Sequence, residues 1–120
     1  MRVTIALLCL GVAAAALAGP PSPPAGTPKL LETGKAVYGS TCLACHGATG
    51  EGNGPVAFAI KPPPRNFVKD KFKNGDSVGA VFATITNGLA NTRMVGYPQI
   101  AEGDRWALAY YVLSLRAGRH

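Results

Sequence analysis

The sequence predicts an all-α domain in which three helices are joined by two long loops. Three stretches place apolar residues at helical spacing, and no stretch alternates between apolar and polar residues as a strand would. Glycine and proline account for 15 and 10 of the 120 residues, so much of the chain must be ordered loop. A chain of this length holds one small domain. Because so much of it is loop, the domain would gain stability from a bound group that links the segments of its core.

The chain opens with an apolar run that is typical of an export signal. The run ends in "ALA" at 16–18, with small residues at the positions that a signal peptidase reads. It is shorter than the roughly 20 residues of a membrane-spanning helix. We therefore predict a cleaved secretory signal over residues 1–18, a proline-rich spacer over 19–28 and the folded domain over 29–120. An exported, periplasmic protein with no stable membrane insertion is expected, and an uncleaved anchor is the alternative.

The first helix is expected to begin at Thr27 and Pro28, which supply an N-cap and a proline in the first turn. It runs from there into the stretch "TCLACHG" at 41–47. Gly34 lacks a side chain and lets another helix approach closely, and Tyr38 follows one turn later. This pair predicts the place where the first helix crosses the last one.

Two more helices follow, separated by a loop. The second is capped by Asp76 or Ser77 and ends at Asn87 and Gly88. Its apolar residues Val78, Val81, Phe82 and Ile85 recur at helical spacing. The last helix lies within 101–118, with Leu108, Tyr111, Val112 and Leu115 on one face. No period survives over 47–75, and the prolines of "KPPPRNF" forbid regular structure there.

The motif Cys42-x-x-Cys45-His46 carries the chemistry of the chain. A redox dithiol of the thioredoxin kind needs strands around it, and none is predicted here. A structural disulfide between the two cysteines would add little stability, because the loop that it closes is so short. A structural zinc site needs four ligands, and the other histidine of the chain is the terminal His120. The contiguous motif is a haem-attachment signature, in which both thiols add to the haem and the histidine faces the iron. We favour haem over these alternatives.

Three stretches together resemble class I c-type cytochromes, the small bacterial monohaem cytochromes c. These are "GKAVYGSTCLACHG", "GEGNGPVAFAIKPPPRNF" and "RWALAYYVLSLR", which resemble the first helix, the Gly/Pro-rich loop and the C-terminal helix of that family. The resemblance implies the class I cytochrome c fold, with about three main helices and long loops wrapped round one covalently attached haem c.

The resemblance also implies a ligand set. Met94 is expected to be the second axial ligand opposite His46, in a sequence that continues with Val95 where many relatives have proline. A carbonyl of the "KPPPR" loop, assigned to Pro62, is expected to accept the other ring N–H of the histidine. Arg65 and Asn66 are expected to hydrogen-bond a haem propionate.

The function expected from these features is the transfer of single electrons between redox protein donors and acceptors, without enzymatic activity. The formal net charge of +6 permits docking on an acidic partner, whereas the lack of a long basic stripe argues against nucleic acid. The lysines of "KDKFK" are interpreted as a solvated face, with a docking patch as the alternative. Two other functions stay open: a haem subunit or module of a larger redox enzyme, and a five-coordinate haem enzyme or gas binder.

Overall fold

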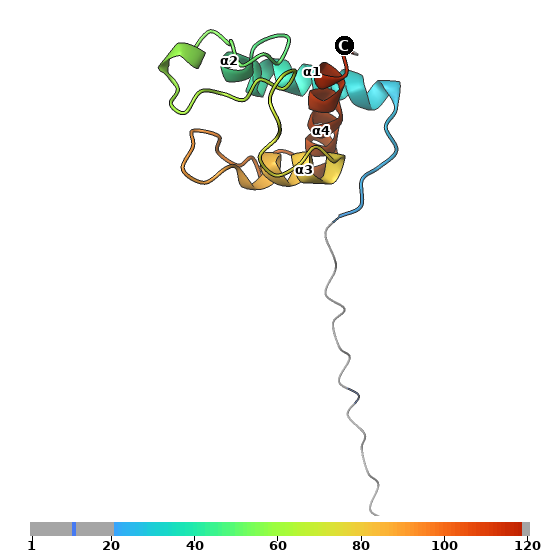
Figure 1. The fold of residues 1–120 in the computed structure, drawn as a ribbon. Coiled ribbons are helices and arrows are strands. Elements are labelled where there is room, and N and C mark those ends of the chain that lie inside the picture. Colours follow the sequence, from blue (N-terminus) through green and yellow to red (C-terminus); the bar gives the residue numbers. More distant parts are fainter. Residues whose placement is uncertain (1–10, 12–20, 119–120) are drawn as a thin grey trace, which may run out of the picture.

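The computed structural model describes Gly11 and residues 21–118, and in that part of the chain it is helical. The elements are α1 (Pro28–Thr41), α2 (Leu43–His46), the short 3-10 helix η1 (Ala57–Ala59), α3 (Val78–Asn87) and α4 (Glu102–Arg116). Helix α4 packs against both α1 and α3 (Figure 1). The one β-pairing within residues 21–118 is an isolated bridge between Gly88 and Val95. The all-α prediction is confirmed.

The predicted helix ends agree closely with the structure. The hydroxyl of Thr27 accepts the N–H of Leu30 at 3.1 Å, and that of Ser77 accepts the N–H of Ala80 at 3.1 Å, so both N-caps form. Helix α3 ends at Gly88, whose φ of +72° suits glycine. Helix α4 ends at Arg116, two residues before the predicted end at 118. The predicted signal over 1–18 lies outside the described residues, apart from Gly11.

Two details differ from the prediction. The first helix does not run unbroken through the cysteine motif, because Cys42 ends α1 and begins α2. The break is small: the Cys42 N–H still reaches the Tyr38 carbonyl at 2.8 Å, and its carbonyl accepts the His46 N–H at 3.0 Å. The second detail is η1, which forms inside the loop predicted to lack regular structure.

The crossing of α1 and α4 forms at Gly34, as predicted. A side chain at this position would overlap the carbonyl of Ala107 and come within 2.8 Å of the Tyr111 Cβ atom. One turn later the ring of Tyr38 meets that of Tyr111 edge to face, with centroids 5.1 Å apart. The buried Tyr38 hydroxyl donates to the carbonyl of Gly47 at 2.6 Å, which ties α1 to the end of α2.

Changing Gly34 to alanine should therefore destabilise the fold by about 1–3 kcal/mol, since the helices must move apart. Gly39 is a matched control on the same helix, because nothing lies within 4 Å of a Cβ atom added there. Gly39→Ala should leave the stability unchanged or raise it by about 0.5–1 kcal/mol through better helix propensity. Guanidinium denaturation followed by circular dichroism measures both. Equal midpoints for the two variants would contradict the close-crossing interpretation.

The segment before α1 is in contact with α4. The hydroxyl of Tyr110 donates to the carbonyl of Pro24 at 2.6 Å. A Cβ atom on Gly26 would lie 2.9 Å from the Tyr110 ring, so the chain passes close to that ring.

Within residues 21–118, no helix combines the length and the apolar character needed to cross a bilayer.

Candidate functional site

A cavity of about 480 Å³ lies among α2, α3, α4 and the two long loops. Most of its wall is apolar. Its lining residues include Thr41, Cys42, Cys45, His46, Ile60, Pro62, Pro63, Pro64, Arg65, Phe67, Phe72, Lys73, Val81, Ile85, Leu89, Arg93, Met94, Tyr97 and Val112. The volume falls within the roughly 300–1,000 Å³ of typical small-molecule and cofactor sites.

The cysteine motif forms one end of this cavity. Cys42 and Cys45 lie one helical turn apart at the α1–α2 junction, and neither thiol is in a disulfide. Both line the cavity together with His46. Burial, with a smaller effect of the nearby Cys45, raises the pKa of the Cys42 thiol to about 11. Cys42, Cys45 and His46 therefore border the same space.

The imidazole of His46 is held by a backbone carbonyl, although not by the predicted one. Its Nδ1 atom lies 3.3 Å from the carbonyl oxygen of Arg65. Pro62 lines the cavity wall instead. Burial lowers the pKa of His46, partly offset by this hydrogen bond, and the ring is therefore neutral at pH 7. A neutral imidazole is the form that binds a metal ion.

The register of the proline loop explains why the acceptor is Arg65. Gly52, with a φ of +76°, lets the chain come so close that an added Cβ atom would lie 2.7 Å from the Pro64 carbonyl oxygen. The N–H of Phe67 donates to the Gly50 carbonyl at 2.7 Å. These two contacts fix the loop on either side of Arg65 and direct its carbonyl at the histidine.

Met94 lines the same cavity from the loop after α3. Its N–H donates to the Thr92 hydroxyl at 3.1 Å, and its carbonyl accepts the Leu89 N–H at 2.9 Å. The Thr92 hydroxyl in turn donates to the Leu89 carbonyl at 2.8 Å. Hydrogen bonds on both sides of the methionine thus order a loop that has Val95, and not proline, next to it.

The two residues predicted to bind a propionate differ in their position relative to the cavity. Arg65 lines the cavity, whereas Asn66 does not. The Asn66 side-chain oxygen accepts the N–H groups of Val68 at 2.9 Å and Lys69 at 3.1 Å. The side-chain oxygen of Asn66 thus caps a turn of its own backbone, as asparagine readily does, and its proposed contact with a propionate stays a prediction for the amide N–H groups.

The sequence analysis did not assign several other cavity residues to the site, among them Phe67, Lys73, Arg93 and Tyr97. The ring of Phe67 lies face to face with that of His46, with centroids 4.4 Å apart and planes 20° apart. Arg93 is the sequence neighbour of Met94, and this adjacency is the one signal that would have found it. The phenol of Tyr97 has a raised pKa because it is partly buried. None of the cavity residues is acidic, so its charged groups are cationic.

The donor atoms fit a covalently bound haem better than a lone metal ion. Within residues 21–118, no three His, Cys, Asp or Glu side chains are placed to hold a metal ion together. The cavity instead combines two thiols, one imidazole and one thioether with a broad apolar wall. Thiols that can form thioethers, and His and Met that can ligate iron, are the groups that haem c requires.

Comparisons with known proteins agree with this chemistry. The family model "Cytochrome c" matches residues 31–116. The chain is 32% identical over 88 residues to the cbb3-type cytochrome c oxidase subunit CcoP of Azospirillum brasilense, covering 73% of this chain and 29% of that one. It is 39% identical over 85 residues to cytochrome c6 of Synechocystis sp., covering 69% of this chain and 63% of that one.

A solved structure is also similar. A chain of the Kuenenia stuttgartiensis reducing HAO-like protein complex matches with a TM-score of 0.76 and 32% identity. The match covers 82% of this chain and 49% of that one. The chain thus spans less than two thirds of the length of each of these three relatives.

Proposed function

The chain belongs to the cytochrome c family as a class I c-type cytochrome, and on that premise we propose that it carries single electrons between redox partners. Members of this family hold covalently attached haem c. In the proposal, Cys42 and Cys45 attach one haem, and His46 and Met94 are its axial ligands. The observation that carries it is the presence of all four side chains in the wall of one cavity.

Each residue has a distinct task in electron transfer. The bound haem supplies a one-electron Fe(III)/Fe(II) couple. His46 keeps its proton on Nδ1, donates it to the Arg65 carbonyl and so leaves Nε2 free for the iron. Met94 offers a soft thioether, which favours Fe(II) more than a second imidazole would. Iron held by both His46 and Met94 would have no position open to a substrate, and this would favour a carrier over a haem enzyme or gas binder.

Other residues set the surroundings of the haem. The guanidinium of Arg65 is available for a propionate, which arginine binds in a bidentate way. Pro62 contributes apolar wall. The ordered loops hold both ligand-bearing segments, so the ligands keep nearly the same geometry in both oxidation states. Small reorganisation of this kind is what an electron carrier needs.

A reduced-minus-oxidised absorption spectrum of the purified protein tests this function. We expect c-type haem bands that change with a reductant, and colour that stays with the protein through acid–acetone extraction. Carbon monoxide should bind the reduced protein poorly. Rapid binding of carbon monoxide would instead favour the five-coordinate haem enzyme or gas binder.

A second candidate is a haem module of a larger redox assembly. The observation that favours it is the length of two relatives, one of which is named as an oxidase subunit and the other as part of a complex. Size-exclusion chromatography of the protein from its native source separates the two functions. A free carrier elutes at the size of the single chain, whereas a module elutes with its partners.

Export is part of the proposal. Residues 1–18 are proposed to be a cleaved signal and 19–28 a spacer ahead of the domain, which places the protein in the periplasm. N-terminal sequencing of the exported protein should then begin at Gly19. A start at Met1 in the membrane fraction would favour the uncleaved anchor.

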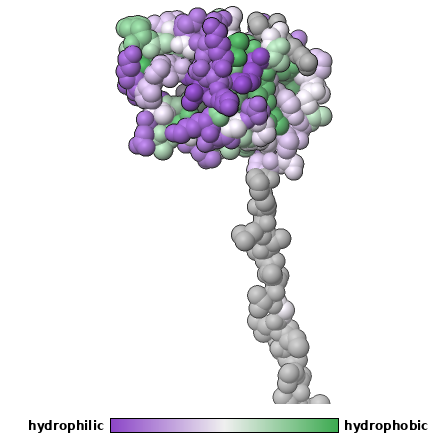
Figure 2. Space-filling model, viewed as in Figure 1, coloured by the Kyte–Doolittle hydropathy of each residue, from purple (hydrophilic) through white to green (hydrophobic). Residues whose placement is uncertain are grey.

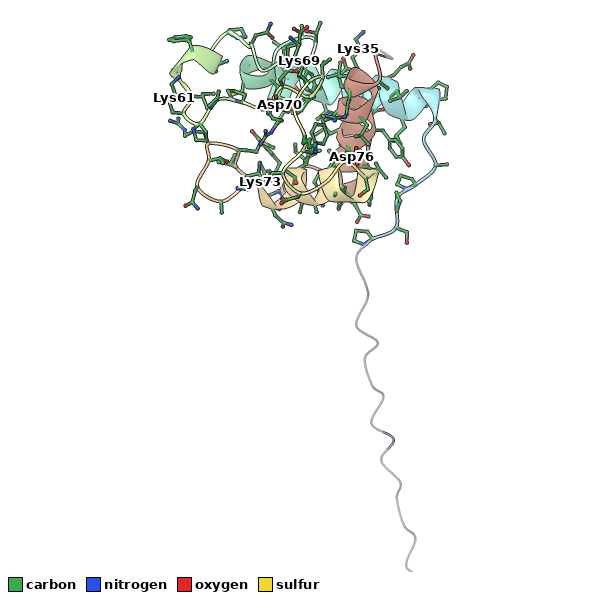
Figure 3. All side chains as sticks on the ribbon, viewed as in Figure 1. Lys35, Lys61, Lys69, Asp70, Lys73 and Asp76 are labelled. Carbon is green, nitrogen blue, oxygen red and sulfur yellow. The ribbon has the colours of Figure 1, made fainter. Side chains whose placement is uncertain are left out.

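Cationic side chains at the cavity suit an acidic redox partner. Lys73 and Arg93 line the cavity, and both are exposed. In Figure 3, Lys61 and Lys73 lie on the side of the loops and α3, whereas Lys35 lies on α1 beside α4. A positive field at the cavity speeds the approach of negative reactants.

The anionic oxidant ferricyanide probes this field directly. Lys73→Glu together with Arg93→Glu should slow oxidation of the reduced protein several-fold at low ionic strength, and salt should remove the difference. Lys29→Glu together with Lys35→Glu, two exposed positions on α1 outside the cavity, is the charge-matched control and should slow the reaction less. Equal rates for the cavity and control variants would show that electron exchange does not pass through this side.

A further inference from the structure

The face of the His46 ring is covered by an aromatic side chain from the proline loop. We propose that Phe67 is a positioning residue for the axial imidazole, and that Arg116 of α4 holds Phe67 in place. This inference rests on the proposed role of His46 as an iron ligand. It adds a contact that lies outside the haem-attachment motif and the ligand pair.

Phe67 is fixed on several sides. Its ring stacks on His46 at a centroid distance of 4.4 Å and meets the ring of Phe72 edge to face at 5.6 Å. Its Cδ2 atom would lie 2.9 Å from a Cβ atom on Gly50, so the glycine leaves room for the ring. Its N–H donates to the Gly50 carbonyl at 2.7 Å. The ring therefore cannot turn away from the histidine without breaking other contacts.

Arg116 fastens this segment to α4. One guanidinium nitrogen donates to the carbonyls of Phe67 at 3.1 Å and Asp70 at 2.6 Å. The guanidinium carbon lies 4.9 Å from the centroid of the Phe72 ring, within reach of a cation–π interaction. A single side chain near the end of α4 thus holds two carbonyls and one aromatic ring of residues 67–72.

The segment acts on the histidine at two places. Arg65 supplies the carbonyl that accepts from Nδ1, and Phe67, two residues on, covers the ring face. The hydrogen bond is long at 3.3 Å, so it depends on the ring being held in place. Removing the Phe67 ring frees the imidazole to turn and lets water reach its Nδ1 proton. Contacts to a metal-bound histidine from neighbouring residues, such as this hydrogen bond and this ring contact, fix its orientation and basicity.

The chain contains a matched control for this arrangement. Arg105, also on α4, donates to the Ile100 carbonyl at 2.9 Å and to the Thr86 hydroxyl at 2.6 Å. Its guanidinium carbon lies 5.0 Å from the Phe82 ring centroid, and Phe82 stacks on Trp106 at 3.8 Å. This second arginine–phenylalanine pair has the same chemistry, but neither residue lines the cavity.

The test follows the His46 Nδ1 proton in the reduced, haem-loaded protein labelled with ¹⁵N-histidine. In Phe67→Ala this proton should exchange with deuterated solvent at least tenfold faster than in the unchanged protein. Phe67→Tyr should restore slow exchange because it keeps the ring, and Arg116→Lys should give an intermediate rate. Phe82→Leu and Arg105→Lys should leave the exchange rate unchanged, although they lower stability.

Two results would overturn the positioning role. One is slow exchange in Phe67→Ala, and the other is equally fast exchange in Phe82→Leu, which would point to a general loss of stability. If Phe67→Ala yields no folded protein, Phe67→Leu and Arg116→Lys take its place with the same expected direction. The Nε2 resonance in the same spectra reports whether the unchanged protein has a His46–iron bond. Its absence would contradict the proposed function and not the Phe67 contact.

Discussion

A variant with both Cys42 and Cys45 changed to alanine should contain no covalently attached haem. These are the cysteines that line the cavity, and each supplies the S–H group that a vinyl side chain of haem would take up. The mass of the intact protein should then equal that of the polypeptide, and acid–acetone should remove all colour. Each single alanine variant keeps one thiol and should retain one thioether or give an unstable product. Haem that resists extraction from the double variant would contradict the attachment assignment.

The double variant should also lose much of its helical structure. Voids in protein cores cost about 24 cal/mol per Å³, and the cavity measures about 480 Å³. The product is on the order of 10 kcal/mol, an upper limit because water can enter. A whole domain is stable by only about 5–15 kcal/mol. Circular dichroism should therefore show a largely unfolded chain, whereas a fully helical haem-free protein would show that the fold does not depend on its cofactor.

The second large effect is expected for Met94→Ala, which removes the thioether while both cysteines stay in place. The haem should remain attached, and the near-infrared sulfur-to-iron band of the ferric protein should disappear. Carbon monoxide should bind the reduced form rapidly. The reduction potential should fall, since the thioether favours Fe(II), by a measurable part of the roughly 0.8 V range that axial ligands span.

Two further variants make this test specific to the sulfur atom. Met94→His should restore six-coordination and exclude carbon monoxide, but with a lowered potential because imidazole supports Fe(III) better. Val95→Ala alters the neighbouring side chain, which is 60% exposed, and should leave carbon monoxide binding as it is. An intact sulfur band in Met94→Ala would rule out this methionine as a ligand.

The parts of the site that could be predicted from the sequence are those that depend on near neighbours. Cys42, Cys45 and His46 lie within five consecutive residues, so their spacing alone places them together. The caps at Thr27 and Ser77 depend only on the three residues that follow each of them. Helix periodicity likewise identified the faces of α3 and α4 that are buried in the core.

The features of the site that the sequence did not predict depend on contacts between distant segments or on competing local hydrogen bonds. Choosing between the carbonyls of Pro62 and Arg65 required the register of one loop on Gly50 and Gly52 of another. Asn66 had a local alternative, because its side chain can cap the turn that follows. Phe67 lies in a stretch without periodicity, so no pattern indicated that it would meet His46.

The exposed apolar surface at η1 was also not predicted from the sequence. Phe58 is 83% exposed and Val56 is 44% exposed, so this short helix presents apolar side chains to solvent. Figure 2 shows apolar residues at the upper left of the molecule, where Figure 1 places η1. Exposure of this kind follows from the path of the loop, which the sequence pattern did not reveal.

The two sides of α3 have a practical consequence for attaching the protein to a solid support. Val81, Thr84 and Ile85 face the cavity, whereas Gly79, Phe82 and Ala83 line a separate hollow shared with Pro21 and Trp106. The chain ahead of α1 therefore reaches the domain on the far side of α3 from the cavity. A linker joined just before Pro21 and bound to an electrode would leave the haem side turned toward solution and open to soluble partners.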